Sequence, residues 1–424
     1  MKKYSKMLTK YKTIVENTLS LAVLNAVNML LPLITLPYLI RTVGLANYGA
    51  YAVIYSILQY VLIISAYGFN YSTTKEISRN RENLNKVNKI VYATLYARFL
   101  ISAIAISVVG CFVYLYYPDT YSISFFWGIG IIIGDTINPV WLYQGMEKMK
   151  YITIVNLSCK LLFTLLIFAF IQEKTDWIYI TALYSCGYFI SGILSLIISK
   201  NIFDIAFVSV KFSDVWKQAK NGWDVFLSTF FMNAYRNSNV FLLGFFVNEY
   251  NVGIYASGEK LIKAAQAIVS PISNALFPYM SRSFRSKKVE ENAKMIFRIG
   301  KKLRLLFFLL IILLIVSSIP LCKLLLGEIN KSFLSVICFL SPVIYFGGMN
   351  YILGIAGLVN MSYSNVFLRF VVISGCISLI VLLSTVAFVG IYSGVMAMLI
   401  SECFLFILCY IKIKNFVKKT HVDS

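Results

Sequence analysis

Apolar stretches of about 20 residues recur along the whole chain, separated by short polar segments. Each stretch can cross roughly 30 Å of hydrocarbon, and a segment in lipid must satisfy its own backbone hydrogen bonds as a helix. The strands of a transmembrane barrel would instead be short and would alternate polar and apolar residues. The pattern predicts an all-α polytopic membrane protein with about twelve transmembrane helices, at residues 14–40, 46–70, 88–115, 122–145, 152–171, 177–199, 222–247, 252–280, 303–325, 333–359, 365–389 and 391–411.

The basic residues between these stretches predict the orientation of the chain, because Lys and Arg resist translocation. When the termini and alternate loops are assigned to one side, that side holds 29 of the 39 Lys and Arg residues. Six lie well inside predicted helices, with Lys89, Arg304 and Lys323 at helix ends counted in the adjoining loops. The opposite side holds only four: Arg41, Lys174, Lys323 and Lys331. We therefore expect both termini in the cytoplasm.

Composition agrees with this picture and removes one class of partner. Charged residues make up 13% of the sequence, against roughly one quarter in soluble domains. The formal net charge is nevertheless +21, and its densest group, Arg282 to Arg304, lies in a predicted cytoplasmic loop. Topology and attraction to anionic lipid account for such loop charges. Nucleic-acid binding, which needs a basic groove interleaved with aromatic residues, is not expected.

The sequence lacks the residues that most enzyme chemistry needs. The eight cysteines are scattered without C-x-x-C spacing, and the single histidine, His421, lies in the tail. Zinc sites and Ser-His or Cys-His nucleophiles therefore lack their components. No Gly-rich phosphate loop is present for ATP hydrolysis. We expect no metal, no cofactor and no enzymatic activity.

Two short motifs recur about half a chain length apart. Asn-x-Gly-x-Tyr-Ala begins at Asn47 and again at Asn251, 204 positions later. A Gly, Met and Tyr at the join of two predicted helices begin at Gly145 and again at Gly357, 212 positions later. The matches indicate a duplication of six helices in the same orientation, with a substrate cavity between the copies; the alternative is coincidence. The predicted parts are an N-terminal six-helix bundle (1–200), a cytoplasmic linker (201–221) and a C-terminal bundle with a basic tail (222–424).

Polar residues inside the predicted helices are the candidates for a binding site, because such groups are costly in lipid. Glu259, Lys263 and Gln266 begin a polar stripe on one helix face, which continues through Ser270, Ser273 and Asn274. Candidates in other predicted helices are Asn25, Asn28, Arg98, Asp135, Asn233, Arg236 and Asn237. Glu402 is a further charged residue inside a helix, and Lys160 and Arg369 are expected to reach an interface.

The positive charge differs between the two predicted copies. The first-copy equivalents of Lys260 and Lys263 are Ser56 and Gln59. This difference favours a site where Arg236, Lys260 and Lys263 bind an anionic group such as phosphate. An internally neutralised network explains the same residues without a ligand, and its predicted pairs are Glu259–Lys263, at i,i+4 spacing, and Asp135 with Arg98 or Arg236.

Several segments, in order along essentially the whole chain, resemble the bacterial polysaccharide flippases that export O-antigen repeat units. These segments are Pro37 to Gly44, Asn47-Tyr-Gly49, Tyr67-Gly-Phe69, Ile77 to Arg81, Trp141 to Tyr151, Val252 to Tyr255, Glu259-Lys260 and Ala275 to Pro278. The resemblance implies two six-helix bundles around a central cavity, as in the wider multidrug/oligosaccharidyl-lipid/polysaccharide exporter superfamily. The peptidoglycan-precursor flippases of that superfamily have two additional helices, for which this chain has no room.

The resemblance also implies the cargo: an undecaprenyl-pyrophosphate-linked oligosaccharide moved from the cytoplasmic to the periplasmic leaflet of the inner membrane. Membrane lipid, a polysaccharide polymerase and a chain-length regulator are the implied partners. No binding motif of the family matches residue by residue, so the candidate residues rest on their own pattern. Two alternatives stay open: an ion-coupled multidrug or small-solute exporter, which would have an acidic cavity, and a non-transporting scaffold, which would not need the polar stripe.

Overall fold

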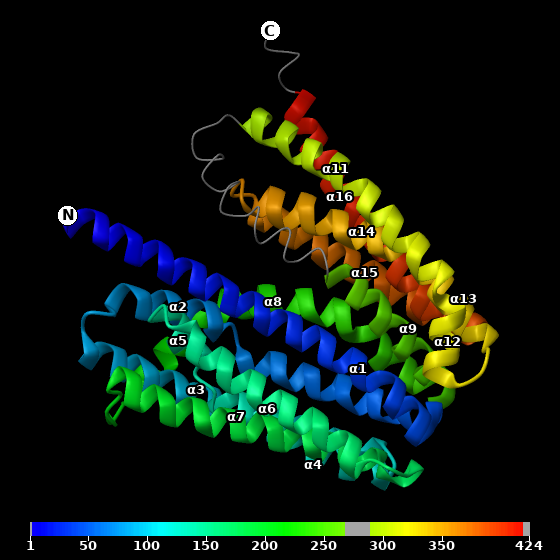
Figure 1. Cartoon of the computed structure of the whole chain (residues 1–424), viewed down its shortest axis with the longest axis horizontal. Helices are drawn as coiled ribbons and strands as arrows, with labels where there is room; N and C mark the ends of the chain where they lie inside the picture. The colour runs from blue at the N-terminus through cyan, green and yellow to red at the C-terminus, as the bar shows by residue number, and fades with distance from the viewer. Residues whose placement is uncertain (1, 268–288, 419–424) are drawn as a thin grey trace. The chain divides into compact units, whose positions relative to one another are not determined.

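The computed structural model describes residues 2–267 and 289–418. These residues form helices joined by short turns, and no strand occurs among them (Figure 1). Contacts divide the chain into two compact units, the first of residues 1–35 and 53–230 and the second of residues 36–52 and 231–424. The all-α architecture predicted from the sequence is confirmed. The predicted limits of the two bundles and the linker stay a prediction.

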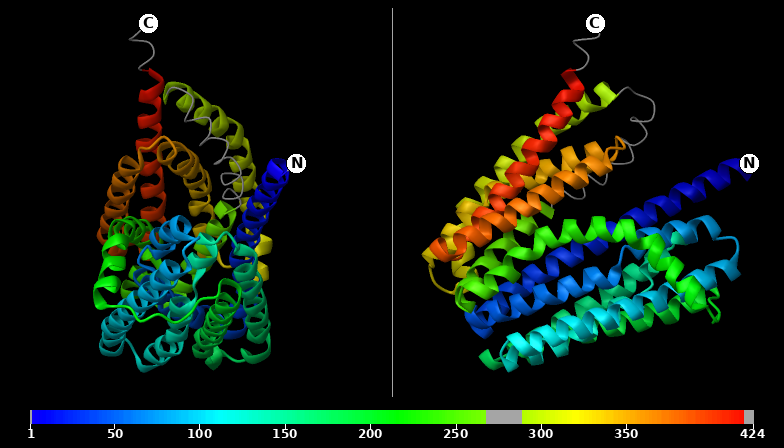
Figure 2. Two further views of the ribbon diagram at one scale, coloured as in Figure 1. Left: turned by 90° about the vertical axis from the view of Figure 1, so that its left-hand side faces the viewer. Right: turned by 180° about the vertical axis from the view of Figure 1, so that it is seen from behind.

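The helices up to residue 246 are α1 (Lys2–Ala66), α2 (Phe69–Asn80), α3 (Leu84–Tyr116), α4 (Asp119–Ile137), α5 (Val140–Gly145), α6 (Met149–Phe170), η1 (Lys174–Ile178), α7 (Tyr179–Phe203) and α8 (Phe212–Phe246). Those that follow are α9 (Glu249–Ala267), α11 (Val289–Val316), α12 (Ser318–Leu326), α13 (Lys331–Leu340), α14 (Pro342–Asn350), η2 (Tyr351–Val359), α15 (Ser364–Val389) and α16 (Tyr392–Lys418). α1 contributes to both units. In the first unit α3, α4, α6 and α7 run side by side (Figure 2).

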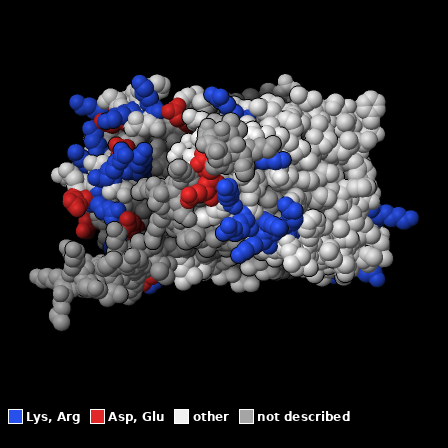
Figure 3. Space-filling view, turned by 90° about the horizontal axis from the view of Figure 1, so that it is seen from above, with Lys and Arg blue, Asp and Glu red and all other residues white. Residues whose placement is uncertain are grey.

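Many of these helices suit a membrane. Eight of the described ones are long and apolar enough to cross it, or up to nine if the bent pair α11–α12 is one span. Phe99, Ile104 and Val108 give α3 an apolar outer surface, since their exposed fractions are 62%, 65% and 65%. Broad surfaces without charged side chains also lie beside groups of Lys and Arg on the face in Figure 3. The chain is therefore a multi-pass membrane protein, and the number of twelve spans stays a prediction.

The helices break where the local sequence requires it. α1 bends at Gly44, whose φ of 82° lies outside the helical region, between the predicted spans 14–40 and 46–70. Glycine adopts this φ without the steric cost of a Cβ atom. α4 stops before Pro139, which cannot donate a helical hydrogen bond, and α5 starts directly after it. α11 and α12 meet at a bend of 52°.

Small residues bring α4 and α7 close together. A Cβ atom on Gly134 would clash with the α7 backbone at Tyr188, and one on Gly192 would clash with the carbonyl oxygen of Gly134. Hydroxyl groups reinforce the contact, because Ser185 Oγ donates to the carbonyl of Trp127 at 2.5 Å. Membrane helices commonly associate through such small residues. The approach places the end of α4 and the middle of α7 beside the same pocket.

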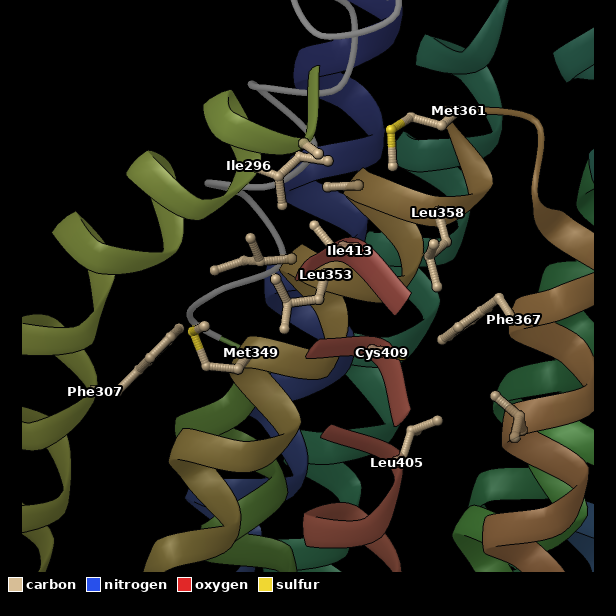
Figure 4. Close-up of a cluster of buried hydrophobic side chains, with 14 residues drawn as sticks. Ile296, Phe307, Met349, Leu353, Leu358, Met361, Phe367, Leu405, Cys409 and Ile413 are labelled. Carbon is tan, nitrogen blue, oxygen red and sulfur yellow. The ribbon is translucent and has the colours of Figure 1, made fainter. Parts of the chain in front are cut away.

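Each unit also has an apolar core. In the second unit, Ile296, Leu353 and Cys409 are fully buried among side chains of α11, α14, η2, α15 and α16 (Figure 4). In the first unit, Trp141 and Tyr143 of the short helix α5 are fully buried. The Tyr143 hydroxyl donates to the carbonyl of Ser195 at 2.6 Å, which satisfies its polar end.

Candidate functional site

A polar pocket of about 330 Å³ lies inside the second unit. Residues of α8, α9, α14, η2, α15 and α16 line it. Five of the residues predicted from the sequence meet there: Asn233, Arg236, Asn237, Lys263 and Gln266. Spacings of three or four residues place them on one face of α8 and one face of α9. The structure therefore brings these side chains together, and their role in binding stays a prediction.

Lys263 is the centre of a hydrogen-bond network in this pocket. Its Nζ atom lies 3.1 Å from Glu259 Oε2, an ion pair at i,i+4 spacing, and it donates to the backbone carbonyl of Arg236 at 3.0 Å. A longer bond of 3.5 Å reaches Asn237 Oδ1. The ion pair predicted between Glu259 and Lys263 is confirmed.

Arg236 differs from Lys263 in making no ion pair with another described residue. Its side chain is exposed and lines the pocket. The ion pairs between described residues do not include its guanidinium. Among the described cations of this pocket, Arg236 is thus the one whose positive charge is not balanced by an ion pair.

The lining of this pocket also includes a buried carboxylate. Glu402 of α16 is 3% exposed and accepts a hydrogen bond of 2.6 Å from Asn350 Nδ2. Gln266 Nε2 donates to the carbonyl of Val343 at 2.8 Å. Gly347 leaves room for this amide, because a Cβ atom at that position would clash with Gln266 Nε2. Tyr351, the first residue of the π-helix η2, also lines the pocket. π-Helical turns often occur at functional sites.

Lys260 and Glu259 have surroundings of their own. Lys260 Nζ lies 5.8 Å from the ring centroid of Tyr48 and 3.5 Å from its hydroxyl, and Lys260 is not among the residues that line the pocket. Glu259 is 5% exposed, and the Tyr255 hydroxyl donates to it at 3.4 Å. The remainder of the predicted stripe, Ser270, Ser273 and Asn274, lies outside the described residues.

A second pocket, of about 420 Å³, lies inside the first unit. Asn28 and Asp135, two of the residues predicted for the binding site, line it, and their role in binding stays a prediction. Arg98 does not line the pocket and is 2% exposed. Its Nη2 atom donates to Asp135 Oδ2 at 2.6 Å. The predicted pairing of Asp135 with Arg98 is confirmed. The side chain of Asn25 lies outside those that the structure describes.

The sequence reasoning missed most of the other residues in the first-unit pocket. Lys160, expected at an interface, instead lines the pocket and donates a hydrogen bond to Asn28 Oδ1. Asn156, Lys160 and Thr164 follow one another at intervals of four along α6. That spacing is a polar stripe in an otherwise apolar helix, and it was the available signal. Among the described residues no cluster suited to a metal ion occurs.

Comparison with known proteins places the chain in a family. The model of the family described as "Polysaccharide biosynthesis protein" matches residues 14–284, which is more than half of the chain. A protein of Escherichia coli (strain K12) named "Putative O-antigen transporter" is 26% identical over 405 residues, covering 94% of this chain and 96% of its own length. A protein of Shigella dysenteriae with the same name is 30% identical over 269 residues, covering 63% of this chain and 67% of its own length.

Solved structures give the fold. An inward-facing multidrug resistance transporter of the MATE family, within the MOP superfamily, superposes with a TM-score of 0.63 at 12% identity. The match covers 91% of this chain and 98% of that transporter. The relatives in sequence and in structure are thus named as transporters. The chain belongs to the polysaccharide biosynthesis protein family and has the fold of the MOP-superfamily transporters.

Proposed function

We propose that this protein is a flippase for an undecaprenyl-pyrophosphate-linked O-antigen or polysaccharide repeat unit. It moves this unit from the cytoplasmic to the periplasmic leaflet of the bacterial inner membrane by alternating access. The two relatives named as O-antigen transporters support this class of cargo. The exporter fold supports transport as the activity.

The observation that carries the proposal is a pair of cations in the pocket of the second unit. Arg236 and Lys263 both line this pocket, and Asn233 and Asn237 lie beside them. A pyrophosphate offers oxygen acceptors to which a guanidinium and an ammonium make charge-assisted hydrogen bonds. Charges inside a membrane protein are costly unless they have a partner. An anionic ligand supplies that partner for Arg236.

The candidate residues have distinct roles in the proposed complex. Arg236 binds the diphosphate with its planar donors, and Lys263 joins it from a network that already orients its ammonium. Lys260 lies beside Tyr48, outside the pocket lining, and adds positive charge at longer range. Glu259 lowers the net positive charge through its ion pair with Lys263. The neutral amides of Asn233, Asn237 and Gln266 bind polar atoms of the head group. The lipid tail stays in the hydrocarbon, since a polar pocket offers it no gain.

The same pocket separates the alternatives. A multidrug exporter that takes up organic cations needs an acidic cavity, whereas here Arg236 and Lys263 face Glu402 alone among the charged lining residues. A scaffold without transport would not require exposed cations inside a membrane unit. The proposal keeps both termini in the cytoplasm of an inner-membrane protein, with a polysaccharide polymerase and a chain-length regulator as partners that receive the product.

The test is complementation of a strain that lacks its own O-antigen flippase. We expect the Arg236→Gln and Lys263→Gln variants, and most strongly the double variant, to lose surface polysaccharide at unchanged membrane levels of the protein. Loss of one charge-assisted hydrogen bond weakens binding about tenfold or more. Matched controls are Arg298→Gln and Lys301→Gln, exposed on α11 and outside the pocket, which should restore normal polysaccharide. Normal surface polysaccharide in the double variant contradicts the proposal.

A further inference from the structure

The pocket of the first unit has no ligand in the proposed function so far. Its volume of about 420 Å³ is in the range of small-molecule sites, which is roughly 300–1,000 Å³. Residues of α1, α4, α6 and α7 line it, and many of them are polar. Polar side chains that surround a cavity within a membrane protein usually face water or a polar ligand. The side chains that line the pocket indicate which kind of ligand fits.

Amide groups form one side of the pocket. Asn138 Nδ2 donates to Asn156 Oδ1 at 3.3 Å, and Ser191 Oγ donates to the same oxygen. These bonds fix the orientation of both amides. Asn138 is 8% exposed, and its Oδ1 atom has no hydrogen-bond partner among the described residues. Such an acceptor is costly, and the Asn156 amide still has donor hydrogens that these bonds do not use.

Aromatic rings also line the pocket. The rings of Tyr55 and Tyr184, both in the lining, lie with their centroids 6.3 Å apart. Tyr188 lines the pocket as well and lies under the Lys160 ammonium, 5.2 Å from its ring centroid. Tyrosine combines an apolar face with a hydroxyl group. Such rings can pack against the C–H face of a sugar ring while amides bind its hydroxyls.

The charged groups of this pocket have partners in the described part of the chain. Asp135 accepts from Arg98 in an ion pair, and Lys160 donates to Asn28 and lies over the Tyr188 ring. Lys160 keeps its positive charge, because Asn28 is a neutral amide. The pocket of the second unit has two lining cations, Arg236 and Lys263. With a single cation and a paired carboxylate, the first-unit pocket suits a molecule rich in hydroxyl groups better than a diphosphate.

We propose that the pocket of the first unit is a saccharide-binding site, which holds a neutral sugar residue of the cargo. Asn138, Asn156 and Gln59 bind its hydroxyls, and Tyr184 and Tyr188 pack against its ring. The inference rests on the proposed function for the source of the sugar. It adds that head-group recognition has two chemically different parts: sugar in the first unit, phosphate in the second.

The experiment uses the full-length protein in detergent or nanodiscs and two water-soluble probes. One probe is the phosphate-free oligosaccharide repeat unit released from the host polysaccharide, and the other is inorganic pyrophosphate. Gln59→Leu is the main variant, because Gln59 lines the pocket and Leu has a similar size without the amide group. Asn156→Leu is the second. Gln172→Leu, in the exposed turn after α6, is the matched control.

We expect the wild type to bind both probes in calorimetry or saturation-transfer NMR. Gln59→Leu should weaken oligosaccharide binding about tenfold, as for loss of one hydrogen bond, and should leave pyrophosphate binding unchanged. The control should bind both probes normally. The inference is overturned if the oligosaccharide does not bind the wild type, if Gln59→Leu and Asn156→Leu bind it normally, or if a lipophilic cation such as tetraphenylphosphonium occupies the pocket in its place.

The two proposals fail in different measurements. If Arg236→Gln and Lys263→Gln keep pyrophosphate binding and surface polysaccharide, the proposed function fails, whatever the oligosaccharide does. If those variants lose pyrophosphate binding and surface polysaccharide while Gln59→Leu binds the oligosaccharide normally, the proposed saccharide site is wrong and the proposed function stands. Thermal unfolding of each variant identifies one that has lost its fold, and the remaining variant of the pair then decides.

Discussion

Gly49 of α1 and Gly253 of α9 lie against each other's helix backbone, and the contact is reciprocal. A Cβ atom on Gly49 would clash with the carbonyl oxygen of Glu249, four residues before Gly253. A Cβ atom on Gly253 would clash with the carbonyl oxygen of Leu45, four residues before Gly49. These glycines are the equivalent positions of the repeated Asn-x-Gly-x-Tyr-Ala motif. The two copies of the motif therefore cross each other in the way expected for a local two-fold relation, which supports the predicted duplication.

The first prediction concerns this crossing. Gly253→Ala should destabilise the protein by about 1–3 kcal/mol, because the added methyl group meets backbone atoms that cannot move aside as a side chain can. Thermal unfolding in detergent, followed by tryptophan fluorescence, measures the change. Gly110→Ala is the matched control: its Cβ would lie 3.4 Å from the Phe125 ring, so the better helix propensity of Ala should leave stability unchanged or raised. Equal effects of the two substitutions would contradict the close contact.

The second prediction concerns the ion pair between the buried Arg98 and the half-buried Asp135. Asp135→Leu leaves the Arg98 guanidinium buried without its counter-charge, although Arg98 also donates to the carbonyls of Ser65 and Asn138. We expect a loss of about 3 kcal/mol, since breaking one side of a buried pair is costly. The double variant Arg98→Leu, Asp135→Leu should recover most of that loss, because no charge is left unpaired. Additive losses in the double-mutant cycle would show that the two residues are not coupled.

The third prediction concerns Glu402 in the second-unit pocket. Glu402→Gln keeps an oxygen that accepts from Asn350 Nδ2 and removes a buried charge, so stability should stay the same or rise. Glu402→Leu removes the acceptor and should cost about 1 kcal/mol, because Asn350 still donates to the backbone carbonyl of residue 402. The comparison is made by thermal unfolding of the two variants. A larger loss for Gln than for Leu would show that the negative charge itself stabilises the fold.

The fourth prediction is a pH dependence at the start of α8. Asp214 accepts from Lys89 Nζ at 2.8 Å, and this hydrogen bond is the main cause that lowers the pKa of Asp214 below its usual range. A lowered pKa in the folded state means that the carboxylate stabilises the protein at neutral pH. This contribution is lost as the pH falls below about 4, where the unfolded state takes up the proton first.

Asp214→Asn and Lys89→Met should therefore flatten the fall in melting temperature between about pH 5 and pH 3. The wild type and each variant are compared in the same detergent by a series of thermal unfolding scans. The two substitutions should act alike, because one removes the titrating group and the other removes the cause of its shift. A wild-type acid dependence that neither variant alters would contradict a role for this pair.

Much of the fold follows from local sequence rules. Apolar stretches of membrane length predicted the helices, and Gly44 lies at the break expected between the first two. The π-helix η2 was not predicted, because its residues, Tyr351–Val359, read as an ordinary apolar helix. Its wider turns are a property of the backbone within the packed unit, and no spacing of side chains along the sequence signals them.

The candidate site was most predictable where its residues share one helix. Glu259, Lys263 and Gln266 were recognised because helical spacing places them on one face. The contact of Lys160 with Asn28 was missed, since the partners are 132 positions apart and only tertiary packing joins them. The repeated glycines were noticed as a motif, but nothing in the sequence states that Gly49 and Gly253 lie in contact. Pairings within a helix can be read from helical spacing, whereas for a pairing between helices the sequence offered alternatives, as for Asp135 with Arg98 or Arg236, and the packing decides between them.

The central claim is that Arg236 and Lys263 bind the pyrophosphate of a lipid-linked saccharide during its transfer across the membrane. The most direct measurement is a flipping assay in proteoliposomes that contain a fluorescent undecaprenyl-pyrophosphate oligosaccharide and the full-length protein. Exposure of the saccharide in the opposite leaflet is followed by its reaction with a membrane-impermeant reagent. We predict rapid exposure with the wild type and with Arg298→Gln, and none above protein-free vesicles with the Arg236→Gln, Lys263→Gln double variant. Transfer by that double variant at the wild-type rate would contradict the account.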